Sequence, residues 1–172
     1  MKAGLILYGL GEHGRVVLDT ALELGWSVLG FADDLEPVRS VPGFPHLGTF
    51  EEALSRYPEA SWHVAIGTNA ARERALGKVM LQTGRELVTL IHPRAWVSPR
   101  AILSPGCWIA PMALVATDAV LGHGCIVNHG ASVDHDALLG ACVHVAPGAR
   151  LPGRITLGDR AFIGCGASFV PG

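Results

Sequence analysis

Histidines carry the clearest acid–base chemistry in this sequence, and one of them, His135, stands between Asp134 and Asp136. An imidazole titrates near neutral pH, so it can accept a proton from a reacting group, and a neighbouring carboxylate can orient it. His135 is therefore a candidate general base, with Asp136 as its orienting residue. The alternative is an exposed histidine beside a solvated carboxylate.

A glycine-rich turn near the N-terminus is the second candidate site. Gly9, Gly11 and Gly14 follow a short apolar run and precede a segment with helical spacing. Backbone N–H groups at such a helix start can bind phosphate, and His13 lies where it could contact a phosphate or a sugar. The alternative is a turn whose glycines serve only its own conformation.

Two carboxylates, Asp33 and Asp34, follow the next strand-like run. A carboxylate at the end of such a strand can accept hydrogen bonds from ribose hydroxyls. One hypothesis is the dinucleotide fingerprint of an NAD-dependent enzyme. We disfavour it because this half of the chain has room for about one mononucleotide-binding unit.

Strand-like and helix-like segments alternate up to about residue 91. Apolar runs predict strands at 5–8, 28–31, 62–66 and 87–91. Apolar residues at helical spacing predict helices at 13–24, 50–57 and 70–83. This alternation indicates a parallel sheet with right-handed crossovers, so we predict a small Rossmann-like α/β domain over residues 1–91.

From about Val97 the sequence follows a repeat of six residues. An aliphatic or aromatic residue recurs at every sixth position, and a small or aliphatic residue follows each by four positions. The recurring residues are Val97, Leu103, Ile109, Val115, Leu121, Val127, Val133, Leu139, Val145, Leu151, Leu157, Ile163 and Phe169. Three six-residue sides would close a triangular coil whose inward side chains stack on those of the next coil. We therefore predict a left-handed parallel β-helix of about four coils over residues 95–172.

The repeat also predicts where the polar residues lie. His123, His129 and His135 share one phase and fall on three different corners, so one chain cannot gather them around a metal ion. His144 precedes an inward valine and points outward from a side, away from the corner of His135, and it could also be a histidine that only faces solvent. A site that uses both would lie between neighbouring copies. Gly153 stacks on His135 at the same corner, where a glycine lets a ligand approach the backbone. The alternative is a glycine that serves only the backbone conformation of the corner.

The bulk composition excludes several partners. Hydrophobic residues make up 49% and charged residues 16%, and the formal net charge is −2 without a run of lysines or arginines. These values predict a folded core and argue against a nucleic-acid partner, which normally needs a basic face. No apolar run is long enough for a membrane span, and the N-terminus lacks a signal-peptide cleavage region. We therefore expect a cytoplasmic protein with no membrane partner.

Two expectations concern packing rather than chemistry. Cys107 and Cys125 stand at repeat positions otherwise held mainly by alanine, which predicts small core residues rather than a disulfide or a metal site. Arg72 falls in the predicted helix at 70–83 and is expected to be a surface charge rather than a residue that binds a ligand.

These motifs resemble those of the hexapeptide acyltransferases. The resemblance covers essentially the whole chain and is strongest to the branch that joins a nucleotide-binding α/β domain to a left-handed β-helix, the sugar O- and N-acetyltransferases of sialic-acid and bacillosamine-type pathways. Besides the repeat, it rests on residues 9–14, Phe31-Ala32-Asp33-Asp34, residues 66–72, Ile91-His92-Pro93, Asp134-His135-Asp136 and residues 144–149.

The resemblance implies an acyl-CoA-dependent transfer, with acetyl-CoA as co-substrate and no metal, to an amino or hydroxyl group of a sugar or nucleotide-sugar. His135 would accept the proton and Asp136, where relatives often have Glu, would orient it. The Gly153 N–H would donate to the thioester oxygen, and His144 would contact the acyl-CoA.

The resemblance also implies an acceptor and an assembly. A nucleotide-sugar, expected to be a UDP-sugar, would be held by the glycine turn, by Asp33 or Asp34, and by the turn that ends at Asn69. The expected assembly is a homotrimer with sites between protomers. The repeat stops at Pro171-Gly172, whereas relatives usually have another coil or so contacting pantetheine and adenine, so we expect either a short variant or a missing end.

Two other functions stay open. A metal-dependent hydratase of the γ-carbonic-anhydrase kind also uses a trimeric left-handed β-helix, although its paired-histidine spacing is not found in this sequence. A non-catalytic protein that binds a nucleotide is the other. Metal content would identify the first, and tight nucleotide binding without CoA binding would identify the second.

Overall fold

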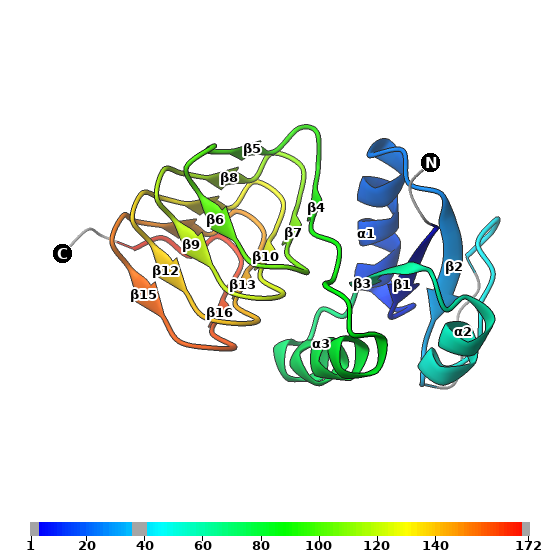
Figure 1. Cartoon of the computed structure of the whole chain (residues 1–172). Helices are drawn as coiled ribbons and strands as arrows, with labels where there is room; N and C mark the ends of the chain where they lie inside the picture. The colour runs from blue at the N-terminus through cyan, green and yellow to red at the C-terminus, as the bar shows by residue number, and fades with distance from the viewer. Residues whose placement is uncertain (1–3, 36–40, 170–172) are drawn as a thin grey trace. The chain divides into compact units, whose positions relative to one another are not determined.

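The computed structural model describes residues 4–35 and 41–169, and the chain divides into two compact units, residues 1–88 and 89–172 (Figure 1). The first unit is an α/β fold with a parallel sheet, and the second is a parallel β-solenoid. The prediction of an α/β domain followed by a parallel β-helix is therefore confirmed. Among the helices of the described residues, none combines the length and apolar character that a membrane span requires.

The first unit is built on a three-stranded parallel sheet. Its strands are β1 (Leu5–Tyr8), β2 (Val28–Ala32) and β3 (Ser61–Val64), in the order β2-β1-β3. Its helices are α1 (Glu12–Glu23), α2 (Phe50–Arg56) and α3 (Asn69–Thr83). The central strand β1 is buried along its whole length, which agrees with its uninterrupted apolar run.

The helix ends follow from local sequence. At the start of α2 the Thr49 side chain accepts the Glu52 N–H at 3.3 Å, and the Glu52 carboxylate accepts the Thr49 N–H at 2.8 Å. This reciprocal pair satisfies two backbone donors that the helix leaves unused. At the end of α3, Gly84 adopts a left-handed conformation with φ of 62°, which stops the helix.

The second unit stacks short strands into three parallel sheets, visible as successive coils in Figure 1. One sheet has the order β16-β13-β10-β7-β4, from β4 (Leu90–Ile91), β7 (Trp108–Ile109), β10 (Ile126–Val127), β13 (His144–Val145) and β16 (Phe162–Ile163). The next has the order β14-β11-β8-β5, from β5 (Trp96–Val97), β8 (Leu114–Val115), β11 (Ser132–Val133) and β14 (Arg150–Leu151). The third has the order β15-β12-β9-β6, from β6 (Ile102–Leu103), β9 (Val120–Leu121), β12 (Leu138–Leu139) and β15 (Thr156–Leu157).

The strand register confirms the predicted coil. Val127 pairs with both Ile109 and Val145, so each turn of the solenoid advances by three repeats. The inward residues form one continuous apolar core. Cys107 and Cys125 belong to that core, and their thiols donate to the carbonyls of Gly122 and Gly140, so the prediction of small core cysteines is confirmed.

The prediction that residues 87–91 form a fourth strand of the α/β sheet is wrong. Leu90 and Ile91 form β4, which pairs with β7 of the solenoid. The physical reason lies in the repeat itself, because Ile91 stands six residues before Val97 and supplies the inward side chain of an earlier side.

Candidate functional site

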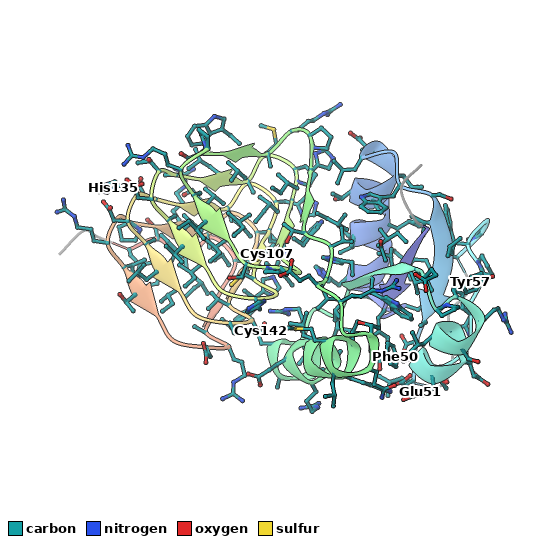
Figure 2. All side chains as sticks on the ribbon, in the orientation of Figure 1. Phe50, Glu51, Tyr57, Cys107, His135 and Cys142 are labelled. Atoms are coloured by element: carbon teal, nitrogen blue, oxygen red, sulfur yellow. The ribbon has the colours of Figure 1, made fainter. Side chains whose placement is uncertain are left out.

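His135 lies at a corner of the solenoid, between β11 and β12, and about half of its side chain is exposed (Figure 2). Its Nδ1 atom lies 2.7 Å from Oδ2 of Asp136, and its backbone N–H donates to Asp134 at 2.7 Å. A carboxylate that is ionised can only accept, so in the neutral imidazole Nδ1 carries the proton and Nε2 carries the lone pair. His135 therefore presents a proton-accepting nitrogen away from Asp136.

Asp136 is suited to this orienting role in two ways. It is the corner residue of its coil and adopts a left-handed conformation with φ of 56°, which aspartate tolerates better than most residues. The hydrogen bond from His135 holds the pKa of Asp136 below its usual value, and the nearby charge of Arg154 acts in the same direction. Asp136 therefore stays ionised at neutral pH.

Gly153 lies against the reactive edge of His135. A Cβ atom at Gly153 would come within 2.5 Å of the His135 Nε2, and Gly153 does not adopt a left-handed φ. A side chain at position 153 would therefore displace the His135 ring, whereas the backbone conformation there does not favour glycine. Within residues 4–35 and 41–169 the Gly153 N–H has no acceptor. The corner thus brings a lone pair and an available backbone donor together.

His144 lies on β13 and faces outward from its sheet, as predicted. Its Nε2 atom lies 3.1 Å from Nδ2 of Asn128, and its ring meets Phe162 edge to face at 5.2 Å between ring centroids. His135 follows a strand of a different sheet. Asn128 and Phe162, rather than His135, are thus the neighbours of His144 in this solenoid.

Asn128 is a polar residue that sequence reasoning missed. It is buried, and its Oδ1 atom accepts the backbone N–H of His129 at 2.8 Å and lies 2.7 Å from Nδ1 of His129. Burial lowers the pKa of His129, which also meets Trp108 edge to face. A signal was present, since Ala110 and Ala146 occupy the matching position in the neighbouring coils.

The three histidines of one repeat phase follow β9, β10 and β11, which belong to three different sheets. His123, His129 and His135 thus occupy separate corners, as predicted. In the described part of the chain, no three His, Cys, Asp or Glu residues are grouped as they would be around a metal ion.

The glycine turn of the first unit borders a cavity of about 390 Å³. Gly9, Gly11, His13 and Asp33 line it, together with the turn that precedes α3. A Cβ atom at Gly11 would meet nothing within 4 Å, so packing does not require that glycine. Gly14 differs, because its Cβ atom would come within 2.2 Å of the Gly9 carbonyl oxygen. Gly11 thus faces open space, whereas Gly14 lets α1 pack against the turn.

Asp33 and Asp34 have different surroundings. Asp33 accepts the backbone N–H of Leu10 at 2.7 Å and that of Leu35 at 2.9 Å, so it holds the glycine turn. Asp34 accepts the Tyr8 hydroxyl, the Lys78 ammonium group and the Phe50 N–H, and it lines a second cavity of about 310 Å³. Asp33 lines both cavities.

Lys78 completes the network around Asp34. Its ammonium group lies 2.7 Å from Asp34 and 2.8 Å from Glu51. Burial alone would lower the pKa of Lys78, but the hydrogen bonds to these two carboxylates raise it above its ordinary value. Asp34 is therefore neutralised by a permanent cation, and its oxygens are largely occupied within the protein.

Asn69 begins α3 and does not line either cavity. Its Oδ1 atom accepts from Arg72, which is 1% exposed and also donates to the carbonyls of Ile66 and Gly67. The prediction that Arg72 is a surface charge is therefore wrong. A guanidinium group can be buried when main-chain oxygens satisfy its donors, and here it stabilises the turn beside the cavity.

The chain is similar to known sugar N-acetyltransferases. Residues 4–79 match the PglD N-terminal domain family. The chain is 30% identical to the GDP-perosamine N-acetyltransferase of Escherichia coli O157:H7, over 96% of this chain and 77% of that protein.

Two solved structures are also similar. One is a His-to-Asn variant of perosamine N-acetyltransferase from Caulobacter crescentus, in complex with CoA and GDP-perosamine, with 36% identity, a TM-score of 0.89, and coverage of 96% of this chain and 79% of that chain. The other is the acetyltransferase domain of PglB from Neisseria gonorrhoeae FA1090, in complex with acetyl coenzyme A, with 39% identity, a TM-score of 0.87, and coverage of 98% and 82%.

Proposed function

The chain belongs to the hexapeptide-repeat sugar N-acetyltransferases, and from this premise we propose that it transfers the acetyl group of acetyl-CoA to an amino group of a nucleotide-sugar. The observation that carries the proposal is the corner where Nε2 of His135 lies against Gly153, whose N–H has no acceptor among the described residues. Membership of this family also favours a transferase over the metal-dependent hydratase and the non-catalytic nucleotide-binding protein.

In the proposed mechanism the acceptor amine attacks the thioester carbonyl carbon directly. A carbon–nitrogen bond forms, the carbon–sulfur bond breaks, and CoA leaves as a thiolate that takes up the proton which His135 has accepted. Nε2 of His135 accepts the proton of the amine, and Asp136 stabilises the resulting imidazolium. The Gly153 N–H donates to the carbonyl oxygen as it gains negative charge, and His144 contacts the acyl-CoA.

The nucleotide of the acceptor would occupy the cavity at the glycine turn. The backbone at Gly11 and the start of α1 would approach the phosphates, His13 the phosphate or the sugar, and Asp33 the ribose hydroxyls. The sequence favoured a UDP-sugar, whereas two of the similar proteins are named for perosamine, in one case as its GDP derivative. The nucleobase of the acceptor is therefore to be determined by experiment, with both GDP- and UDP-linked sugars as acceptors.

A homotrimer is part of the proposal. Ile102 and Leu138 face outward from the sheet β15-β12-β9-β6 and are 61% and 48% exposed, although both are large and apolar. Their burial against another copy would stabilise an assembly, and a site between protomers could then use His135 of one copy and His144 of another. The cytoplasmic location stays a prediction.

Thiol release from acetyl-CoA tests the proposal, with GDP- and UDP-linked amino-sugars and free sialic acid as acceptors. We expect turnover with one class of nucleotide-sugar and a decrease in kcat of about 100-fold or more in His135→Ala, because a general base contributes that much. His123→Ala is the matched control, since His123 has the same repeat phase at another corner. Turnover that survives His135→Ala would place proton transfer elsewhere, and no turnover with any acceptor would contradict the function.

A further inference from the structure

A hydrogen-bonded chain runs from His129 through Asn128 to His144. We propose that Asn128, held by His129, is a positioning residue that keeps His144 neutral with its proton on Nδ1 and its Nε2 lone pair occupied. His144 would then be unable to compete with His135 as the base. The consequence for catalysis rests on the proposed function, whereas the protonation pattern does not.

The orientation of the Asn128 amide is fixed by its neighbours. Oxygen and nitrogen of an amide look alike in shape, so their assignment must come from an unambiguous neighbour. The backbone N–H of His129 is such a neighbour, because it can only donate, and it lies 2.8 Å from the Asn128 side chain. The atom that it meets must be the oxygen. A reversed amide would place two donors face to face in a buried position.

The orientation of the Asn128 amide determines which nitrogen of His144 carries the proton. With the oxygen on the His129 side, the Asn128 NH2 group faces Nε2 of His144 at 3.1 Å. An NH2 group donates, so Nε2 must be the acceptor and the proton of the neutral ring must be on Nδ1. Protonation of Nε2 would oppose two donors and leave the buried NH2 group without its acceptor, which is costly.

The ring of His129 makes a second contact with Asn128. Its Nδ1 atom lies 2.7 Å from the same Asn128 oxygen, so it acts as a second donor to that oxygen. Burial lowers the pKa of His129, and the edge contact with Trp108 at 5.6 Å between ring centroids restricts its ring. Two donors on one oxygen hold the amide more firmly than one.

The two histidines therefore differ in what their Nε2 lone pair can do. In His135 the carboxylate of Asp136 accepts from Nδ1 and leaves Nε2 available for a proton. In His144 the Nε2 lone pair already accepts from Asn128. Two imidazoles that carry their proton on the same nitrogen are thus directed to different roles, and the ring of His144 is held at a set angle against Phe162.

Nuclear magnetic resonance of the 15N-labelled full chain tests the protonation pattern directly, because long-range 1H–15N correlations distinguish the two imidazole tautomers. The His144 signals are assigned by their loss in His144→Gln. We expect the wild type to carry the proton on Nδ1. In Asn128→Asp, a carboxylate replaces the NH2 donor with nearly the same shape, so we expect His144 to carry a proton on Nε2.

Kinetics then test the positioning role. Asn128→Asp should raise the KM for acetyl-CoA about three- to tenfold, the effect of losing one hydrogen bond, with a smaller change in kcat. His129→Ala should raise it less, because the backbone donor to Asn128 remains, and the control His123→Ala should leave both constants unchanged.

A wild-type His144 protonated on Nε2, or an Asn128→Asp variant with the wild-type pattern, would overturn the inference. The wild-type spectrum suffices for this even if the variant does not fold. If the wild type turns over no acceptor but shows the Nδ1 proton, the proposed function fails and the protonation pattern stands.

Discussion

Two neighbours determine how His135 can react. One is the carboxylate of Asp136, and the other is Gly153, which has a hydrogen atom in place of a side chain. The oxygen of Asp136 directs the lone pair to Nε2, and the absence of a side chain at Gly153 leaves room for that nitrogen. At the scale of single residues, a substitution of Gly153 should therefore change this corner although His135 and Asp136 stay the same.

We predict that Gly153→Ala lowers kcat about 100-fold, the range seen when an oxyanion donor or a base is misplaced, with little change in the KM for acetyl-CoA. The added Cβ atom would lie within 2.5 Å of Nε2, so the imidazole must move. Gly158→Ala is the matched control, because a Cβ atom there meets nothing within 4 Å. Steady-state thiol release measures both. An unchanged kcat in Gly153→Ala would contradict the arrangement of this corner.

Among the secondary-structure elements, β3 contains a histidine with a structural role. His63 is 1% exposed, and its Nδ1 atom lies 2.8 Å from the carbonyl oxygen of Val88. Burial lowers the pKa of His63 to about 4. The unfolded chain therefore binds a proton on this side chain at higher pH than the folded chain does, and stability should fall as pH decreases from about 6.5 towards 4.

We predict that His63→Gln reduces this acid sensitivity. Glutamine can also donate to the Val88 carbonyl but does not gain a proton, so the part of the pH dependence due to His63, on the order of 3 kcal/mol, should disappear. Thermal denaturation of both proteins between pH 4 and pH 7 measures the difference. His46→Gln is the control, since His46 is exposed in the same unit. If the melting temperature depends on pH equally in the wild type and in His63→Gln, other groups cause the acid sensitivity.

At the scale of the whole molecule, the solenoid presents large apolar side chains to solvent in a regular column. Ile102 and Leu138 occupy the outward position in β6 and β12, with the partly buried Val120 between them on β9. Exposure of apolar side chains to water is unfavourable, so association with a second copy that buries them would lower the free energy. The same assembly would complete a site that uses two protomers.

We predict that Leu138→Lys shifts the protein from trimer to monomer and lowers the specific activity in parallel. The charge would have to be buried in the interface, which is unfavourable. Light scattering after size-exclusion chromatography gives the mass, and thiol release gives the activity. Leu81→Lys is the matched control, because Leu81 is 86% exposed on α3. A monomeric wild type, or a trimeric Leu138→Lys, would refute the proposed interface.

The period of six determined the solenoid, because side chains that recur at a spacing of six residues can point into a triangular coil and stack on those of the neighbouring coils. The phase of the repeat also placed His135 on a corner, His144 on an outward face and Gly153 beside His135. Ile91 has the same spacing, six residues before Val97. The apolar run at 87–91 favours a strand of the α/β sheet, and this prediction is wrong because it does not use the repeat position of Ile91.

Only the tertiary structure decided how polar groups are paired, because pairing depends on residues far apart in the chain. Sequence alone could not separate Asp33, which holds the glycine turn and lines both cavities, from Asp34, whose oxygens serve Tyr8, Phe50 and Lys78. It likewise missed the burial of Arg72 and the link from Asn128 to His144, which lie in adjacent coils. A periodic pattern thus determines which way each side chain points, whereas the direction of each hydrogen bond is set by neighbours that only the folded chain brings together.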